Sequence, residues 1–430
     1  MIPSYRWLVE GSYPLVGTTS VSGGKNPALA VLAASLLCDD TCVIENVPDV
    51  DDIRVMLLLM RSIGAKATYA GADGRSIVVD PRGVNSDNPP AELARKIRAS
   101  SYLMGALLGK LGQAEVAYPG GCDIGARTLD QHVKGFAALG ACAKDQLGAV
   151  KLTSNGLRGA EIYMDVVTVG GTINLIIAAA KAEGTTLIFN AAKEPHVVEV
   201  ANFLNSMGAV IKGAGTDVIR VKGVAKLHGS TYAIIPDQIV TGTIMIAAAA
   251  TMGDVTIAGC IPTHMEALTA KLLESGVRVD YHDDTIRVRS NGAHRSITLK
   301  TQAYPGFPTD LQQPMTALLT TARGISVVTE TIFESRFRQL GELARMGANI
   351  TVDRNRAAIT GVSSLHGAKI TATDLRAGAS LVIAALMAKG TTEICEPIHI
   401  DRGYENLTDK LNALGARITI QNADTMEEPA

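Results

Sequence analysis

Hydrophobic and polar residues follow one pattern that recurs six times along the chain. An amphipathic stretch ends in a glycine and is followed by a stretch in which hydrophobic and polar residues alternate. This pattern predicts a helix, a left-handed glycine cap and a strand. The copies are MRSIGAKATYA, FAALGACAKDQ, LNSMGAVIKGA, LLESGVRVDYH, LARMGANITVD and LNALGARITIQ, with glycines at Gly64, Gly140, Gly208, Gly276, Gly347 and Gly415. The glycine spacings are 76, 68, 68, 71 and 68 residues, so six units fill the chain.

A second motif precedes each glycine by about 25 to 35 residues. It is a helix rich in Ala and Leu, then a small turn and a strand. The copies are LAASLLCDDTCVIENV, LGKLGQAEVAYPGG, IIAAAKAEGTTLIFNA, IAAAATMGDVTIAGC, LLTTARGISVVTET and IAALMAKGTTEICEP. Each unit therefore runs strand, helix, strand, loop, helix, strand. Its first helix is apolar on nearly all sides, which indicates a helix buried at the centre of a domain.

Three such units can share their buried helices and place their sheets outside. We therefore expect an α/β fold of two inside-out domains, each with three pseudo-symmetric βαβ-type repeats around buried central helices. An open solenoid is the first alternative, but solenoid repeats usually run about 20–50 residues. A closed six-unit ring around DNA is the second, and it would need a basic lining.

Composition narrows the possible partners. The 430 residues include 40 Lys and Arg against 42 Asp and Glu, a formal charge of -2. Bulk charge therefore gives no attraction to nucleic acid or to an anionic membrane. The longest stretch without an ionisable side chain is 16 residues, residues 238–253, which is too short for a membrane span. The first residues lack the apolar core of a signal peptide. We expect a cytoplasmic protein with no nucleic-acid or membrane partner.

Cysteine and histidine usage predicts neither disulfides nor a metal site. The six cysteines are expected to be reduced thiols, and the eight histidines are scattered singly. Five of the cysteines lie in apolar helices or strands and are predicted to be inert packing residues: Cys38, Cys42, Cys142, Cys260 and Cys395.

The loops that open the second helix of each unit are the places where chemistry is expected. Helix N-termini on such a rim favour anions. The loop PGGCDIGARTLDQH is the most unusual, because three glycines surround Cys122 and Arg127 follows. This glycine density predicts a mobile lid. A thiol near a guanidinium and a helix start can act as a nucleophile or an acid, although neighbouring Asp123 opposes a lowered pKa.

Cations near loop ends form a second group: Lys25, Arg98, Arg127, Arg336, Arg376 and Arg402. Several such cations in one cleft would suit a substrate with phosphate and carboxylate groups. Asp310, in YPGFPTDLQQP, also opens a helix. It could be the helix N-cap, or it could serve as a general base.

Seven motifs in order carry a family resemblance: SGGKN, RAS, PGGCDIGAR, FPTDLQQ, ESRF, TDLRAGAS and HIDRGYE. From about residue 20 to residue 420 the chain resembles the UDP-N-acetylglucosamine 1-carboxyvinyltransferases, enolpyruvyl transferases that open peptidoglycan precursor synthesis. The resemblance implies the two inside-out domains that the repeats predict. It also implies two chain crossings, which place one domain at 22–235 and a discontinuous one at 1–21 and 236–430.

The resemblance implies transfer of the enolpyruvyl group of phosphoenolpyruvate to the sugar 3-hydroxyl, with release of phosphate. Cys122 would protonate the methylene carbon, Asp310 would take the hydroxyl proton, and Lys25 and Arg402 would complete the catalytic set. Neither a metal nor a cofactor is expected. Fosfomycin, an epoxide phosphonate, would alkylate Cys122. The implied substrate-binding residues are Lys25, Asn26, Arg98, Arg127, Leu129, Asp130, Gln131, His132, Thr168, Val169, Gly170, Asp310, Arg336, Arg376 and Arg402.

The chain departs from the family pattern at Thr128, Thr168 and the segment IPDQIV, where the family commonly has Pro, Ser and IPDRIE. The last departure leaves room for another nucleotide acceptor. Shikimate 3-phosphate is the acceptor of the sister enzyme, which uses no lid cysteine, so PGGCDIGAR argues against it. A silent relative that acts as a regulator, and the six-repeat clamp, are the non-enzymatic alternatives.

Overall fold

The chain forms two compact units. The computed structural model describes residues 5–71, 74–121, 124–146 and 148–422. The N-terminal unit comprises Gly23–Cys122 and Arg127–Ile235. The C-terminal unit comprises Met1–Ser22, Asp123–Ala126 and Pro236–Ala430. The domain boundaries expected from sequence, at residues 22 and 235, stay a prediction.

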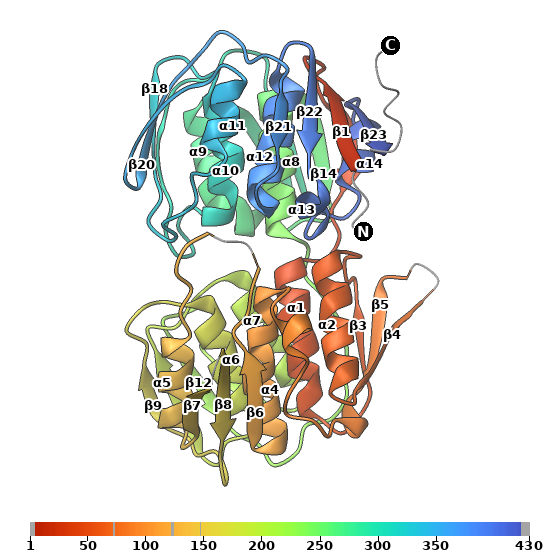
Figure 1. Cartoon of the computed structure of the whole chain (residues 1–430), viewed down its shortest axis with the longest axis vertical. Helices are drawn as coiled ribbons and strands as arrows, with labels where there is room; N and C mark the ends of the chain where they lie inside the picture. Colours follow the sequence, from red (N-terminus) through yellow and green to blue (C-terminus); the bar gives the residue numbers. More distant parts are fainter. Residues whose placement is uncertain (1–4, 72–73, 122–123, 147, 423–430) are drawn as a thin grey trace. The chain divides into compact units, whose positions relative to one another are not determined.

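The N-terminal unit carries three sheets on its outside (Figure 1). The first sheet has, in spatial order, β13 (Thr231–Ala233), β3 (Cys42–Glu45), β5 (Ser76–Asp80) and β4 (Lys66–Ala70). The second has β6 (Gln113–Ala117), β8 (Ala149–Thr153) and β7 (Cys142–Gln146). The third has β11 (Val210–Lys212), β12 (Val218–Lys222), β10 (Thr185–Phe189) and β9 (Glu161–Tyr163). Its helices are α1 (Lys25–Ala34), η1 (Ser35–Leu37), α2 (Asp51–Ser62), η2 (Pro81–Gly83), α3 (Ala91–Ala94), η3 (Arg98–Ser101), α4 (Tyr102–Leu111), α5 (Asp130–Ala138), α6 (Val169–Ala179) and α7 (Pro195–Ser206).

The C-terminal unit repeats this arrangement. Its first sheet has, in spatial order, β21 (Lys369–Thr371), β22 (Thr391–Cys395), β1 (Tyr5–Glu10) and β23 (Arg417–Asn422). Its second has β15 (Arg278–His282), β16 (Thr285–Arg289), β14 (Asp254–Ala258) and β2 (Val16–Ser20). Its third has β17 (Thr298–Lys300), β18 (Ile325–Thr329), β20 (Arg356–Thr360) and β19 (Asn349–Asp353). Its helices are α8 (Gln238–Ala250), η4 (Pro262–Met265), α9 (Glu266–Glu274), α10 (Thr309–Leu319), α11 (Leu340–Arg345), α12 (Leu375–Met387), α13 (Ile398–Asp401) and α14 (Leu407–Ala413).

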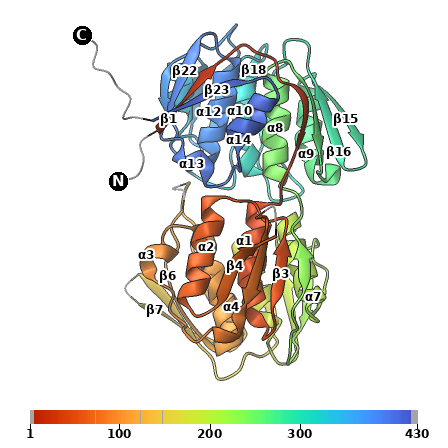
Figure 2. The same ribbon diagram turned by 90° about the vertical axis from the view of Figure 1, so that its right-hand side faces the viewer.

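Five of these sheets share one topology: a parallel pair followed by two antiparallel pairings. In one of them, β1 lies between β22 and β23, so strands from the first and last parts of the described chain pair in a single sheet (Figure 2). The sheet of β6, β8 and β7 has no fourth strand in the described part of the chain. At the open edge of β6, the Glu115 N–H donates one hydrogen bond to Asp87 O, where the other sheets have a parallel strand. Pro89 and Pro90 follow Asp87, and because proline has no N–H group they cannot extend a ladder of hydrogen bonds.

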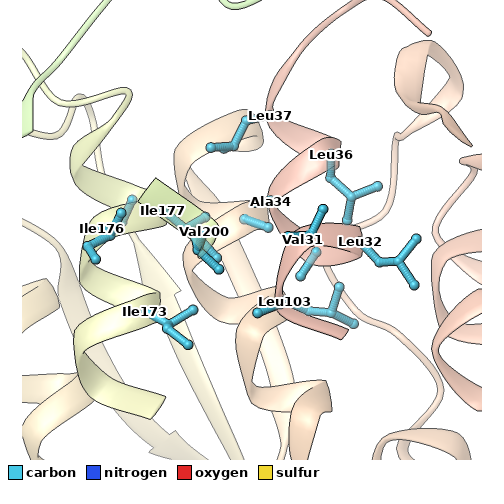
Figure 3. Close-up of a cluster of buried hydrophobic side chains, with 14 of the residues drawn as sticks. Val31, Leu32, Ala34, Leu36, Leu37, Leu103, Ile173, Ile176, Ile177 and Val200 are labelled. Carbon is cyan, nitrogen blue, oxygen red and sulfur yellow. The ribbon is translucent and has the colours of Figure 1, made fainter. Parts of the chain in front are cut away.

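The first helix of each repeat is buried, as its sequence predicts. In the N-terminal unit, side chains of α1, η1, α4, α6 and α7 interlock, among them Leu32, Leu103 and Ile176, each 0% exposed (Figure 3). In the C-terminal unit, α8, α10 and α12 pack against one another. The α/β fold with central helices and outer sheets is therefore confirmed, and an open solenoid is excluded for the described residues.

The second helix of each repeat ends at the predicted glycine. All six repeat glycines have positive φ angles, between 91° and 102°. An L-residue with a side chain reaches this conformation only at a cost.

In the described residues, no helix is long and apolar enough to cross a membrane.

Two glycines at the ends of α11 test this capping role. Gly347 follows the helix with φ +95°, whereas Gly341 lies inside the helix with open space where a Cβ would be. We expect Gly347→Ala to lower the free energy of unfolding by about 1–2 kcal/mol. Gly341→Ala should be neutral or stabilise by up to about 1 kcal/mol. Urea unfolding of both variants measures the difference, and equal effects would contradict the capping role.

Candidate active site

A carboxylate and two buried arginines meet at the start of two central helices. Asp310 is the second residue of α10, and Arg376 is the second residue of α12. Asp310 Oδ2 accepts hydrogen bonds from Arg376 Nη2 at 2.9 Å and Nε at 3.1 Å, and Oδ1 accepts one from Arg336 Nη2 at 2.7 Å. The arginine side chains are each 5% exposed, and that of Asp310 is 24% exposed. These contacts bring the starts of α10 and α12 to the same end of the unit.

Asp310 faces two arginines, Asp237 also acts on Arg376 through its charge, and the two arginines have spare donors. Burial alone would raise the pKa of Asp310, but Arg376 and Arg336 outweigh it and hold that pKa well below its usual range. Arg336 Nε and Nη1 and Arg376 Nη1 are buried and have no hydrogen-bond partner within the described part of the chain. Buried donors without partners are costly. The cluster is therefore suited to receive an additional anion.

Aromatic rings hold the two guanidinium groups in place. The Arg376 guanidinium carbon lies 5.1 Å from the centre of the Tyr404 ring, and that of Arg336 lies 5.3 Å from the Phe333 ring. Tyr404 is 2% exposed, and its hydroxyl lies 3.0 Å from Thr243 Oγ1 of α8. Tyr404 therefore connects α8 to the start of α12.

A second buried carboxylate organises the loop that carries Arg336. Glu330 is 2% exposed and follows β18. It accepts hydrogen bonds from the hydroxyls of Thr301 at 2.8 Å and Thr309 at 2.9 Å, and from the Ile332 N–H at 2.8 Å. Because Thr309 begins α10, Glu330 fixes the residue next to Asp310 together with the loop before Arg336.

In the N-terminal unit, Lys25 begins the buried helix α1 and forms a buried ion pair. Its Nζ lies 2.8 Å from Asp52 Oδ2 in the first turn of α2, and the side chains are 7% and 9% exposed. Asn26 follows and is partly buried. The start of α1 thus holds an ammonium group whose position is fixed by α2.

Arg98 and Arg127 bring two further guanidinium groups together. Arg98 Nη2 donates to the backbone carbonyl of Arg127. Burial, followed by the charge of Arg127, lowers the pKa of Arg98 to about 10. Two cations that disfavour each other's charge would gain from an anion between them. Arg98 also lies in η3, directly before the buried helix α4.

The start of α5 carries a polar network. Gln131, 7% exposed, donates to Asp130 at 2.8 Å and to Asp165 at 3.2 Å, and accepts from the Asp165 N–H at 2.9 Å. Thr128 also donates to Asp130. Leu129 is buried in the core and precedes the helix. This network ties the loop before α5 to the loop before α6.

His132 and the start of α6 form a buried polar corner. His132 is 2% exposed, and neither ring nitrogen has a hydrogen-bond partner among the described residues. A Cβ on Gly170 would lie 3.0 Å from His132 Nε2, so the ring packs against the first turn of α6. Thr168 is the N-cap of α6, Val169 its first residue, and no side chain caps the helix. Burial, with a smaller effect of the Arg98 charge, lowers the pKa of His132 to about 4.

Cys122 lies outside the described residues, but both flanks of its loop are described. A Cβ on Gly120 would lie 1.7 Å from Arg95 O, so glycine permits close backbone packing there. Beyond Cys122, the Ser335 N–H donates to Ile124 O at 3.0 Å, and the Ala126 N–H donates to Glu334 at 3.2 Å. The flanks are anchored, and the mobile lid stays a prediction. Arg402 follows α13 and is partly buried.

The structure brings together Asp310 with Arg336 and Arg376, Arg98 with Arg127, and His132 with Gly170. Sequence reasoning missed Asp52, Tyr404 and Glu330, although Asp52 lies in a loop that opens the second helix of a repeat and Tyr404 lies in the motif HIDRGYE. For Glu330, the available signal was a charged residue directly after an apolar strand. Within the described ranges, no group of three His, Cys, Asp or Glu residues could hold a metal.

Two interpretations from sequence are wrong. Asp310 is not the N-cap of α10, because Pro308 occupies that position and the Asp310 side chain binds arginines instead. Cys142 is not a packing residue, because it is exposed on β7. The alternating pattern placed Cys142 in a strand correctly, but this strand is largely exposed.

Comparisons with known proteins assign the family. The family model of EPSP synthase (3-phosphoshikimate 1-carboxyvinyltransferase) matches residues 9–411. The chain therefore belongs to this family of carboxyvinyltransferases. It is 54% identical over 413 residues to UDP-N-acetylglucosamine 1-carboxyvinyltransferase 3 of Caldanaerobacter subterraneus subsp. tengcongensis, covering 96% of this chain and 98% of the relative. It is 52% identical to UDP-N-acetylglucosamine 1-carboxyvinyltransferase 2 of Geobacillus kaustophilus, covering 95% of each. The family resemblance is confirmed.

Solved structures agree on the fold. The enolpyruvyl transferase NikO from Streptomyces tendae has a TM-score of 0.88 and 26% identity, covering 98% of this chain and 100% of that one. EPSP synthase from Acinetobacter baumannii has a TM-score of 0.75 and 18% identity, covering 97% and 100%, and this likeness concerns the fold alone.

The buried His132 makes stability depend on pH. Its pKa is about 4 in the folded chain and about 6.5 when unfolded, so its neutral form contributes stability above pH 6.5 that is lost as the pH falls toward 4. We expect His132→Gln to flatten the fall in unfolding free energy over this range by up to about 1.4 kcal/mol per pH unit. Urea unfolding between pH 7.5 and 4 measures the slope.

The control for this measurement is His282→Gln, which changes a side chain that is 88% exposed and should leave the slope as it is. Slopes rather than absolute values are compared, because a buried glutamine can change stability at every pH. An unchanged slope in His132→Gln would contradict the assignment.

Proposed function

We propose that this protein transfers the enolpyruvyl group of phosphoenolpyruvate to the 3-hydroxyl of UDP-N-acetylglucosamine and releases phosphate. The observation that carries the proposal is the 54% identity, over nearly the whole chain, to a relative with that acceptor in its name. The site supports it, because Arg336 and Arg376 keep buried donors beyond those given to Asp310, and such guanidinium groups suit substrates that bring phosphate and carboxylate groups.

Phosphoenolpyruvate and the departing phosphate would be held by Lys25, Arg127 and Arg402, supported by Arg98 and Arg376. The charge of Arg127 contributes to lowering the pKa of Arg98, and a bound anion would relieve this. Arg336 and Arg376 retain buried donors beyond those given to Asp310. Fixed guanidinium groups would thus provide the charge stabilisation that phosphate release requires.

Asp310 would take the proton of the 3-hydroxyl as its oxygen bonds to C2 of phosphoenolpyruvate. The two arginines keep Asp310 ionised at neutral pH and make it a weak base. It would therefore orient the hydroxyl first and accept the proton only as the new C–O bond forms, when the hydroxyl becomes strongly acidic.

Cys122 would give a proton to the methylene carbon, which makes C2 the electrophile. Loss of phosphate and of one proton from the resulting methyl group then restores the vinyl group. Asn26 and Asp310 would contact the sugar, and the uridine would lie along Leu129, Asp130, Gln131 and His132. The pyrophosphate would lie at the start of α6 (Thr168, Val169 and Gly170), where backbone N–H groups favour anions.

We also place the reaction in the cytoplasm, as the first committed step toward peptidoglycan and thus a requirement for cell growth, shape and division. The test of the whole proposal is release of phosphate from phosphoenolpyruvate by the purified protein. Release should depend on UDP-N-acetylglucosamine. Dependence on shikimate 3-phosphate instead would assign the sister reaction, and no release with either would indicate a silent relative.

Cys122 is tested by substitution and by fosfomycin. Cys122→Ala should nearly abolish turnover because the proton donor is lost, whereas Cys122→Asp should keep activity with a more acidic pH optimum. Fosfomycin should inactivate the native protein covalently and spare the Asp variant, since a carboxylate is the poorer nucleophile. Peptide mass mapping locates the adduct. Adducts on Cys38, Cys142, Cys260 or Cys395 instead, or a fully sensitive Asp variant, would refute the role.

Asp310→Asn removes the base but keeps the size of the side chain. We expect turnover to fall by about two to four orders of magnitude, with a cooperative unfolding transition retained. The matched control is Asp374→Asn, which changes the N-cap of α12 and keeps a capping oxygen. It should cost no more than about tenfold. Near-normal turnover in Asp310→Asn would leave Asp310 as an ion-pair partner only.

A further inference from the structure

Two cysteines that the proposed reaction does not use lie with their sulfur atoms in contact. The Sγ atoms of Cys38 and Cys42 are 3.7 Å apart, and the residues are 1% and 0% exposed. Cys38 follows η1, the continuation of the central helix α1, and Cys42 begins β3. The three residues between them, 39–41, are exposed. Two regular elements therefore hold a thiol pair just beneath an exposed turn.

The surroundings make the two thiols unequal. The hydrogen bond with Cys42 lowers the pKa of Cys38 against the opposing effect of burial, and a backbone hydrogen bond at Asp40 and the charge of Lys110 lower it further. The same hydrogen bond, together with burial, raises the pKa of Cys42. Lys110 is fixed at this place, because its Nζ donates to Cys38 O at 2.7 Å and to Asp39 Oδ1 at 3.0 Å. The surroundings thus favour ionisation of Cys38 over that of Cys42.

Cys260 shows what an ordinary buried thiol looks like in this chain. It is 3% exposed, and its sulfur lies 3.5 Å and 3.4 Å from the carbonyl oxygens of Ile257 and Asp284. The sulfur of Cys38 also lies near two carbonyl oxygens, at 3.5 Å from Ser35 and 3.1 Å from Asp40, so the neighbouring sulfur of Cys42 and the ammonium group of Lys110 are what distinguish it. Burial and the charge of Asp284 raise the pKa of Cys260 to about 11. Metal binding does not account for the Cys38–Cys42 pair, because within the described ranges no third ligand completes a site.

We propose that Cys38 and Cys42 are a reversible oxidation site, which hydrogen peroxide converts into an intramolecular disulfide. The Cys38 thiolate attacks one peroxide oxygen and the O–O bond breaks, which gives a sulfenic acid and hydroxide. Cys42 loses its proton and attacks the Cys38 sulfur, the S–O bond breaks, and a second hydroxide leaves. The two thiol protons convert the hydroxides to water. Two thiols are oxidised and one peroxide is reduced to two waters.

The geometry asks for a small movement only. A disulfide bond is about 2.05 Å long, so the sulfurs must approach by roughly 1.7 Å from their separation of 3.7 Å. Peroxide is small, and brief opening of the exposed turn at residues 39–41 would admit it. In a reducing compartment the pair stays a dithiol, and reduction by thiols restores it after oxidation.

The experiment treats the reduced full-length protein with hydrogen peroxide, quenches with catalase, alkylates the denatured chain with iodoacetamide and digests it with trypsin. Both cysteines lie in one tryptic peptide, Asn26–Arg54. We expect this peptide to lose two hydrogen atoms, to resist alkylation, and to regain two alkylation sites after reduction. The loss should be at least about tenfold faster than oxidation of Cys260, the buried thiol with a raised pKa.

Cys42→Ser is the matched variant. Its Cys38 should gain oxygen or remain alkylatable, and the loss of two hydrogens should disappear. If this variant does not fold, the mass of the peptide Asn26–Arg54 from the peroxide-treated native protein still shows whether the disulfide forms. Full alkylation of Cys38 and Cys42 at a peroxide dose that oxidises the exposed Cys142 would overturn the proposal, as would a disulfide from either residue to another cysteine.

Discussion

A helix that is apolar on all sides must be surrounded by protein, and this constraint shapes the whole chain. Each repeat contributes one such helix and cannot bury it alone. In the C-terminal unit, α8, α10 and α12 solve the problem by packing together, and the sheets cover them from outside. Helices that start at one end of a unit also place their free N–H groups there, so the packing that stabilises the fold creates an environment for anions.

Asp310 shows how that environment is kept stable before substrate arrives. Arg336 and Arg376 are buried at the helix starts, and two buried cations without a counterion would be costly. The carboxylate of Asp310 compensates for part of their charge, and the nearby carboxylate of Asp237 also acts on Arg376. The cluster is thus stable enough to fold, and its buried donors without partners can still bind an anion. Glu330 holds Thr309 beside Asp310, and the Tyr404 ring packs against the Arg376 guanidinium, so the cluster keeps its geometry through contacts within the protein.

The repeats could be predicted from sequence because they rest on local rules. The six glycines have the predicted left-handed conformation, and the apolar helices are buried. Side-chain partners could not be predicted, because they depend on which segments meet. Asp310 looked like a helix cap, but Arg336 and Arg376, from distant segments, bind its carboxylate. Cys38 and Cys42 looked like inert core residues, and only the turn between η1 and β3 brings their sulfurs together.

The pairing of β1 with both β22 and β23 has a consequence for synthesis on the ribosome. The N-terminal unit needs nothing beyond residue 235, so its core can close while translation continues. Strand β1 is synthesised before both of its partners, β22 and β23, and cannot pair with them until they have been made. Until β22 and β23 are made, both edges of β1 lack their native partners and can pair with another chain. The nascent chain therefore carries an exposed strand with two open edges for most of its synthesis.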